Sequence, residues 1–157
     1  MKVNDRRYKQ AAEVVQSFLA INSAIGKLVQ RNAASLGLTL HQMAIVNTLA
    51  PVPNLTLKEL AERLTTAKST VSVNVDELVQ AGLIVRVTSE QDRREIKLSL
   101  SEAGREKSRQ STENAYSYRA MDAVLTRMSA DEVARVLDTN RQILAELENH
   151  EDFLHHS

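Results

Sequence analysis

The chain has 157 residues, of which 43% are hydrophobic and 3% aromatic, as expected for one small domain with an aliphatic, helix-rich core. It contains no cysteine, which excludes disulfides, thiolate nucleophiles and cysteine-ligated zinc. The net charge of zero is unevenly distributed: residues 1–31 carry six basic and two acidic residues (+4), whereas residues 127–157 carry three and seven (−4). Ends of opposite sign attract where they meet, within one chain or between two chains.

No apolar run approaches the ~20 residues of a membrane-spanning helix. The charged start of the chain is not followed by the hydrophobic region of a secretory signal. We therefore expect a cytoplasmic protein without a membrane partner.

Apolar residues at three-four spacing predict a first helix from about Asp5 to Ser35, with Gly37 as its C-cap. Such a helix is on the order of 45 Å long. This is too long and too one-sided for a small monomeric core, so its apolar stripe is expected to contact a partner. Thr39 is placed to cap a second helix that continues to Ala50.

The stretch TLKE, from Thr56 to Glu59, is a capping box and opens a third helix. A short TTA break separates it from a fourth helix, Lys68 to Ala81. Two apolar, β-like runs then predict strands at 83–87 and 95–100, joined by the charged loop EQDRRE.

Ser101 is expected to cap a fifth helix that is polar up to Asn114 and has its apolar residues further on, as far as Met128. A second capping box, SADE from Ser129 to Glu132, opens a sixth helix. The predicted order is α-α-α-α-β-β-α-α, a mainly helical fold with a small β-wing.

A capped short helix, a tight break and a second helix form the pattern of a helix-turn-helix, whose second helix enters the major groove of DNA. Small Ala61 is expected where the two helices cross. In the wing that follows, Arg93 and Arg94 at the tip can reach phosphates or a narrow minor groove. The loop alone is more often a solvated turn, and only the preceding helix pair favours DNA binding.

The stretch from Leu55 to Glu106 resembles the winged helix-turn-helix of the MarR family of bacterial transcription regulators. The resemblance rests on LAERL, STVS..VD.L...GLI.R, DRR and L.L...G in this order and spacing. It implies one MarR-like domain over residues 1–157, with a DNA-binding lobe at 39–100 and dimerisation helices at 1–36 and 115–157. The implied homodimer places two lobes on an inverted repeat of double-stranded DNA.

The resemblance further implies a sequence-specific regulator, expected to be a repressor. Many members of the family release DNA when a small, often aromatic, effector binds between the lobe and the dimerisation helices. Here that cleft is expected between the first helix, the second helix and the start of the fifth. The missing cysteine excludes regulation by thiol oxidation.

The expected DNA contacts fall into two sets. The recognition helix offers Lys68, Ser69, Thr70, Ser72, Val73 and Asn74, and the wing and backbone set consists of Arg86, Arg93, Arg94 and Lys97. Asp92 is expected to orient one of its neighbouring arginines by ion pairing. Val73 suits a thymine methyl group and Asn74 an adenine, which predicts an A·T-rich operator.

Two residues depart from the family pattern, because Val73 and Glu77 stand where the recognition helix usually carries basic residues. Residues 56–98 also balance seven basic against seven acidic side chains. A dimeric small-ligand or protein-interaction module that has weak or lost DNA binding is therefore the alternative.

An enzyme is disfavoured, because the four scattered glycines form no phosphate-cradling loop and no nucleophile motif is present. No cofactor is expected. A metal site at His150, His155 and His156 is not expected either, because the spacing is not HExxH.

Overall fold

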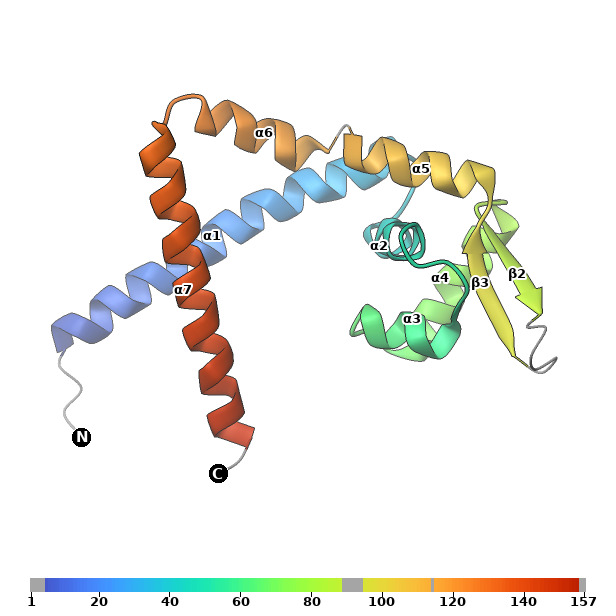
Figure 1. The fold of residues 1–157 in the computed structure, drawn as a ribbon, viewed down its shortest axis with the longest axis horizontal. Helices are drawn as coiled ribbons and strands as arrows, with labels where there is room; N and C mark the ends of the chain where they lie inside the picture. The colour runs from blue at the N-terminus through green and yellow to red at the C-terminus, as the bar shows by residue number, and fades with distance from the viewer. Residues whose placement is uncertain (1–4, 89–94, 114, 156–157) are drawn as a thin grey trace. The chain divides into compact units, whose positions relative to one another are not determined.

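The structure, a computed structural model, describes residues 5–88, 95–113 and 115–155 (Figure 1). Side chains are described from Arg6 to Asn149 within these ranges, so the three C-terminal histidines lie outside them. The chain forms two compact units, Met1–Ser117 and Tyr118–Ser157.

The first unit contains the helix pair and the sheet. Its elements are α1 (Asp5–Ser35), α2 (Leu40–Leu49), β1 (Leu55–Thr56), α3 (Leu57–Arg63), α4 (Lys68–Gln80), β2 (Ile84–Thr88), β3 (Ile96–Leu100) and α5 (Glu102–Glu113). Helix α6 (Tyr116–Leu125) begins at the end of this unit, and α7 (Ala130–His155) belongs to the second unit. The predicted mainly helical fold with a small wing is confirmed.

The predicted helix starts are confirmed by their hydrogen bonds. The Thr39 and Thr56 hydroxyls each accept a bond from the backbone amide three residues on. The side chains of Gln42 and Glu59 in turn accept a bond from the backbone amide of Thr39 and Thr56. At the start of α7, the Ser129 amide donates to Glu132 at 2.7 Å. Ser101 accepts a bond from the Gly104 amide at 3.1 Å. These bonds satisfy amides that the first turn of a helix leaves unpaired.

Two predicted elements differ in the structure. The continuous fifth helix is divided into α5, which ends at Glu113, and α6, which begins at Tyr116. The Ser111 and Thr112 hydroxyls bond to the Ser108 carbonyl, at 2.8 and 3.2 Å, and such back-bonding weakens a polar helix near its end. A third strand, β1, also joins the predicted pair, and two residues are too few for an alternating pattern to reveal it.

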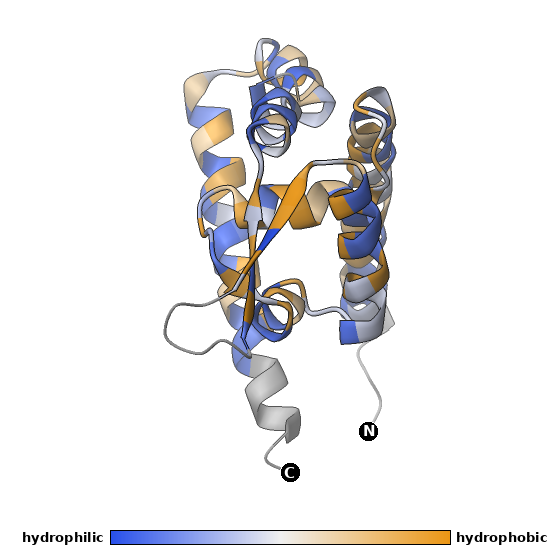
Figure 2. Cartoon of the chain, turned by 90° about the vertical axis from the view of Figure 1, so that its right-hand side faces the viewer, coloured by the Kyte–Doolittle hydropathy of each residue, from blue (hydrophilic) through white to orange (hydrophobic). Residues whose placement is uncertain are grey.

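The sheet is antiparallel in the order β1-β3-β2. Leu98 in the central strand pairs with Leu55 of β1 and with Arg86 of β2. Its side chain, 2% exposed, joins a core that α2, α3 and α4 complete with Val46, Leu60 and Val75, among others. In Figure 2, hydrophobic and hydrophilic bands alternate along the helices, as expected where one face is buried.

Helix α5 approaches the lobe so closely that it requires a glycine. A Cβ atom on Gly104 would lie 2.1 Å from the Leu83 carbonyl oxygen and 3.2 Å from the Leu100 side chain. No side chain fits at such a distance. In the L.L...G pattern, formed by Leu98, Leu100 and Gly104, the glycine therefore lies where α5 packs against the end of the wing.

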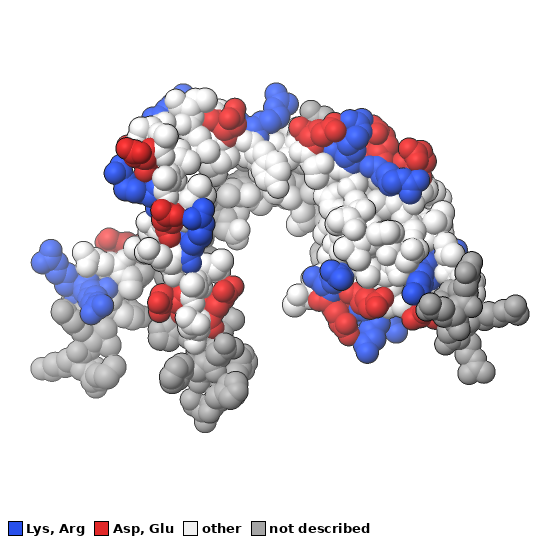
Figure 3. All heavy atoms as spheres, in the orientation of Figure 1, with Lys and Arg blue, Asp and Glu red and all other residues white. Residues whose placement is uncertain are grey.

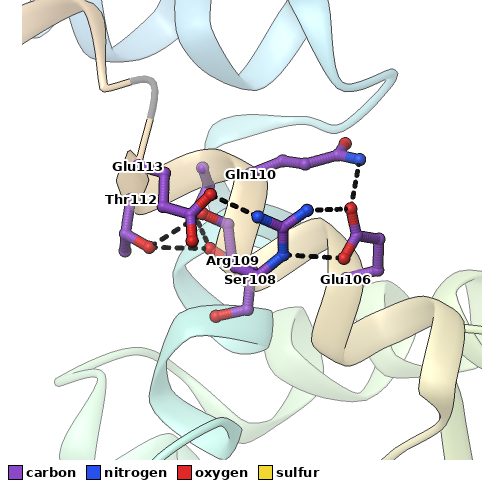
Figure 4. A network of polar contacts seen from close by, with 7 residues as sticks. Glu106, Ser108, Arg109, Gln110, Thr112 and Glu113 are labelled. Carbon is purple, nitrogen blue, oxygen red and sulfur yellow. Dashed lines mark hydrogen bonds and ion pairs between the residues drawn. The ribbon is translucent and has the colours of Figure 1, made fainter.

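The exposed side of α5 carries a network of ion pairs (Figures 3 and 4). Arg109 lies between two carboxylates, donating to Glu106 at 2.8 Å and to Glu113, while Gln110 donates to Glu106 at 2.7 Å. The hydrogen bonds from Arg109 and Gln110 lower the pKa of Glu106 to about 2. Side-chain pairs of this kind support a helix that buries little apolar surface.

Helices α1 and α7 expose their apolar residues. Every side chain from Arg6 to Ala24 of α1 is exposed, including Val15 at 57% and Leu19 at 62%. On α7, Leu137 and Leu144 are 50% and 57% exposed. Within the described part of the chain, no helix has the length and apolar content to cross a membrane.

Candidate nucleic-acid interface

Helix α4 begins without a side-chain cap. Its N-cap is Ala67, and no described side chain bonds to the first amides of the helix. The Thr66 hydroxyl donates instead to the Leu64 carbonyl, at 2.9 Å. The first amides of α4 are therefore free to donate to another molecule, and the positive end of the helix dipole favours an anion such as a phosphate.

The side chains of α4 divide into an exposed face and two flanks. Ser69, Thr70 and Val73 are exposed, Val73 at 58%, and lie within about one turn of each other. Ser72 and Asn74, which were predicted to share this face, are half-buried on its sides. The Asn74 amide donates to the Thr70 carbonyl at 2.9 Å, which leaves the Asn74 side-chain oxygen as an acceptor.

One flank of α4 is connected to the wing. Asp76 forms an ion pair with Arg86 of β2, and both side chains are about half exposed. Arg86 was predicted as a DNA contact from its charge alone. Its guanidinium pairs with the Asp76 carboxylate of the recognition helix. Arg86 therefore links the wing to α4, whether or not it also contacts a phosphate.

The other flank of α4 is connected to α2. The side-chain amide of Gln42 donates to a carboxylate oxygen of Glu77 at 2.7 Å. The capping-box pattern Thr39-x-x-Gln42 could have revealed the role of Gln42 in α2. Its link to Glu77 joins residues 35 positions apart, and no local pattern predicts it.

The described part of the wing places Lys97 on β3, half-buried, 3.7 Å from Glu95. The predicted contacts Arg93 and Arg94 and the orienting Asp92 lie outside the described residues.

Cations and carboxylates are interspersed over the lobe (Figure 3). Lys58 lies 3.8 Å from Glu62, and Arg86 and Lys97 are paired as described above. Among the described basic residues of the lobe, this leaves Arg63 and Lys68 without a carboxylate partner. Lys68 is also the first residue of α4, so its charge lies beside the uncapped amides.

The carboxylate of Glu59 is committed to the capping box of α3. Hydrogen bonds from the Thr56 backbone amide and hydroxyl lower the pKa of Glu59. This acidic residue stabilises the first helix of the pair and has a structural role that requires no ligand.

Comparison with known proteins identifies the lobe. Residues 36–95 match the sequence model of the MarR family. The multiple antibiotic-resistance repressor MarR of Listeria monocytogenes is 29% identical, with a TM-score of 0.69 over 90% of this chain and 96% of that one. No curated protein matches the chain in sequence.

Two further solved structures share the fold. YusO of Bacillus subtilis is 24% identical, with a TM-score of 0.72 over 92% of this chain and 99% of that one. FabT of Streptococcus pneumoniae, solved in complex with DNA, is 23% identical, with a TM-score of 0.68 over 90% and 98%. MarR-family members are transcription regulators and not enzymes.

Proposed function

We propose that the chain is a MarR-family regulator that represses transcription by binding an A·T-rich inverted repeat as a homodimer. The exposed start of α4 carries this proposal. Lys68, Ser69, Thr70 and Val73 surround uncapped amides on a helix of the length and position that enter a major groove. The Val73 side chain suits the methyl group of thymine.

The remaining contacts follow from the two sides of this face. Ser72 and Asn74 reach base edges or phosphates only at the margins of α4, because both are half-buried. Lys97, with Arg93 and Arg94, supplies the wing contacts, and Asp92 orients one of the two arginines. Arg86 contributes positive charge while it remains paired with Asp76.

The exposed apolar faces support the homodimer. Apolar side chains this exposed on α1 and α7 mark a surface that a partner covers. The opposite net charges of the two ends of the chain favour contact between α1 of one copy and α7 of another.

Charged variants of both faces, Leu19→Glu and Leu144→Glu, are expected to give monomers in sedimentation equilibrium. Arg63→Glu, an exposed charge change in the lobe and outside both charged ends, is the control.

An effector site is proposed between α1, α2 and α5. This region holds a buried polar network, in which Asn32 donates to the Ser111 carbonyl at 2.9 Å. The Ser108 hydroxyl donates to the Asn47 side-chain oxygen at 2.9 Å, and the hydroxyl oxygen of Ser111 lies 2.8 Å from the same Asn47 oxygen. The polar group of a small aromatic compound can replace one of the hydrogen bonds within this network by a hydrogen bond to the compound. Benzoate and phenol are suitable probes, and a ligand that binds here is expected to lower DNA affinity through its preference for one lobe orientation.

Fluorescence anisotropy on A·T-rich inverted repeats, at several salt concentrations, tests DNA binding. Lys68→Ala and Arg93→Ala are each expected to reduce the salt slope by about one, because each removes one phosphate contact. Glu62→Gln, which changes charge on α3, is the matched control and leaves the slope almost unchanged. An unchanged slope in Lys68→Ala contradicts the proposed docking of α4.

The alternative function is a dimeric interaction module without DNA binding. It is favoured by the equal numbers of acidic and basic residues in the lobe and by Glu77 on the recognition helix. Dimerisation without binding to any duplex at low salt is the result that supports it.

A further inference from the structure

Glu77 has the wrong charge for a residue on a DNA-reading helix, yet its exposed carboxylate has a hydrogen-bond partner within the protein. It accepts a 2.7 Å hydrogen bond from the side-chain amide of Gln42 on α2. We propose that Glu77 is a positioning residue, which fixes the recognition helix α4 against α2 through Gln42. This inference rests on the proposed DNA-binding function and concerns how that function is achieved.

Gln42 is itself held in place, which makes the bond directional. The Gln42 side-chain oxygen accepts a hydrogen bond from the Thr39 backbone amide at 3.0 Å. The Thr39 hydroxyl accepts a hydrogen bond from the Gln42 backbone amide at 3.2 Å. The single amide group of Gln42 therefore joins the start of α2 to Glu77. A side chain fixed at one end loses little further freedom when its other end forms a bond.

The apolar contact between α2 and α4 leaves a freedom that this bond removes. Ile45 of α2 and Val71 and Leu78 of α4 are each 1% exposed and pack in one core. Apolar contacts are non-directional, so they resist separation of the helices more than rotation of α4 about its axis. A small rotation would move Ser69 and Val73 out of register with a groove.

The opposite flank carries a second polar connection. Asp76, the residue before Glu77, pairs with Arg86 of β2. Successive helix residues are about 100° apart around the axis, so the two carboxylates reach toward different neighbours. Together they hold α4 from the wing side and from the α2 side, about one to two turns beyond the exposed residues that face DNA.

Two substitutions at position 77 separate this role from simple repulsion of DNA. Glu77→Ala and Glu77→Gln remove the same negative charge, but only glutamine keeps an oxygen that can accept the Gln42 bond. If Glu77 positions α4, Glu77→Gln binds DNA about threefold more tightly than Glu77→Ala, the effect of one modest hydrogen bond. If Glu77 only repels phosphates, the two variants bind equally.

A third substitution excludes a direct contact between the new glutamine and a base. Gln42→Met has a similar length but no hydrogen-bonding group, and it weakens the cap of α2 equally in every position-77 variant. In the Gln42→Met background, positioning predicts that Glu77→Gln and Glu77→Ala bind equally. A direct contact with DNA would preserve the threefold advantage and overturn the inference.

Exchanging the amide of Gln42 and the carboxylate of Glu77 between the two positions should restore DNA binding. Gln42→Glu keeps the capping-box acceptor but places two carboxylates together, and it is expected to weaken DNA binding. Adding Glu77→Gln restores a donor and an acceptor and should return affinity to near the wild-type value. Circular dichroism and urea unfolding verify that each variant is folded.

The outcomes distinguish the two proposals. Absence of DNA binding by the wild-type chain overturns the proposed function and, with it, the positioning role. Salt-dependent binding by the wild type, with equal affinities for Glu77→Ala and Glu77→Gln, overturns the positioning role alone.

Discussion

The winged lobe and the long helices use similar apolar residues in opposite ways. In the lobe, Val46 and Leu60 are fully buried. On α1 and α7, Leu19 and Leu144 are about 60% exposed, although both residues lie within long continuous helices. The lobe therefore completes its own core, whereas α1 and α7 leave a hydrophobic face exposed, which the proposed partner would cover. Amphipathic periodicity predicts a buried face in both cases, but it does not say whether the same chain buries it.

The largest expected effect separates these two regions directly. Leu60→Ala removes a fully buried side chain of the lobe and is expected to lower the free energy of unfolding by about 2–5 kcal/mol. Leu144→Ala should change the stability of the single chain by about 0.5 kcal/mol or less. Urea unfolding at two protein concentrations makes the distinction, because Leu144→Ala lowers stability only where dimers form. Equal losses at low concentration would mean that α7 is part of a single-chain core.

The two glycines at helical positions give the next largest contrast. Gly104→Ala forces a Cβ atom against the Leu83 carbonyl and is expected to cost about 3 kcal/mol. Gly26→Ala on α1 meets no atom within 4 Å and should stabilise the helix by about 0.5–1 kcal/mol. Thermal unfolding of both variants checks the pair. If Gly104→Ala is tolerated, α5 does not approach the wing as described.

A smaller gain is expected at the turn between α3 and α4. Thr65 has a φ of 49°, in the left-handed region that costs a β-branched residue about 1–2 kcal/mol. Thr65→Gly should therefore stabilise the lobe by about 1 kcal/mol, partly offset by the greater freedom of glycine in the unfolded chain. A lower unfolding midpoint in this variant would show that the turn does not strain Thr65.

The smallest expected effect concerns pH and the α5 network. Because bonds from Arg109 and Gln110 lower the pKa of Glu106 from 4.5 to about 2, its contribution to stability is complete above pH ~4.5. It is lost as the pH falls from there through about 2. Glu106→Gln should make the acid-induced decrease in stability slightly smaller, as measured by urea unfolding between pH 6 and pH 2. An identical decrease in both proteins would remove Glu106 from the acid response.

Most of the fold could be predicted from the sequence because the residues that start its helices lie close together in the chain. Thr56 and Glu59 lie three residues apart, and so do Ser129 and Glu132, so their capping boxes can be read from the sequence. The strand β1 and the division of the fifth helix into α5 and α6 were missed. The first depends on pairing with the distant Leu98, and the second on hydroxyl groups that bond to the helix backbone.

The candidate site was predicted less completely, for the same reason. The sequence placed Lys68 and Val73 on the exposed side of α4, where the structure has them, and their contact with DNA stays a prediction. Charge and position did not identify the partners of Arg86 and Glu77, because Asp76 and Gln42 reach them only after the helices and the wing have packed. From its charge alone, Glu77 is expected to weaken DNA binding. The structure instead shows that its carboxylate accepts a hydrogen bond from Gln42.

We propose that two copies of the chain join through their exposed helices and present two α4 helices to one side of a duplex. Selection of bound sequences from random duplexes tests it most directly, because binding, symmetry and spacing are measured together. We predict enrichment of an inverted repeat with A·T-rich half-sites about one helical turn apart, roughly 10 base pairs. Enrichment of a single asymmetric half-site, or of no sequence at all, would contradict the account.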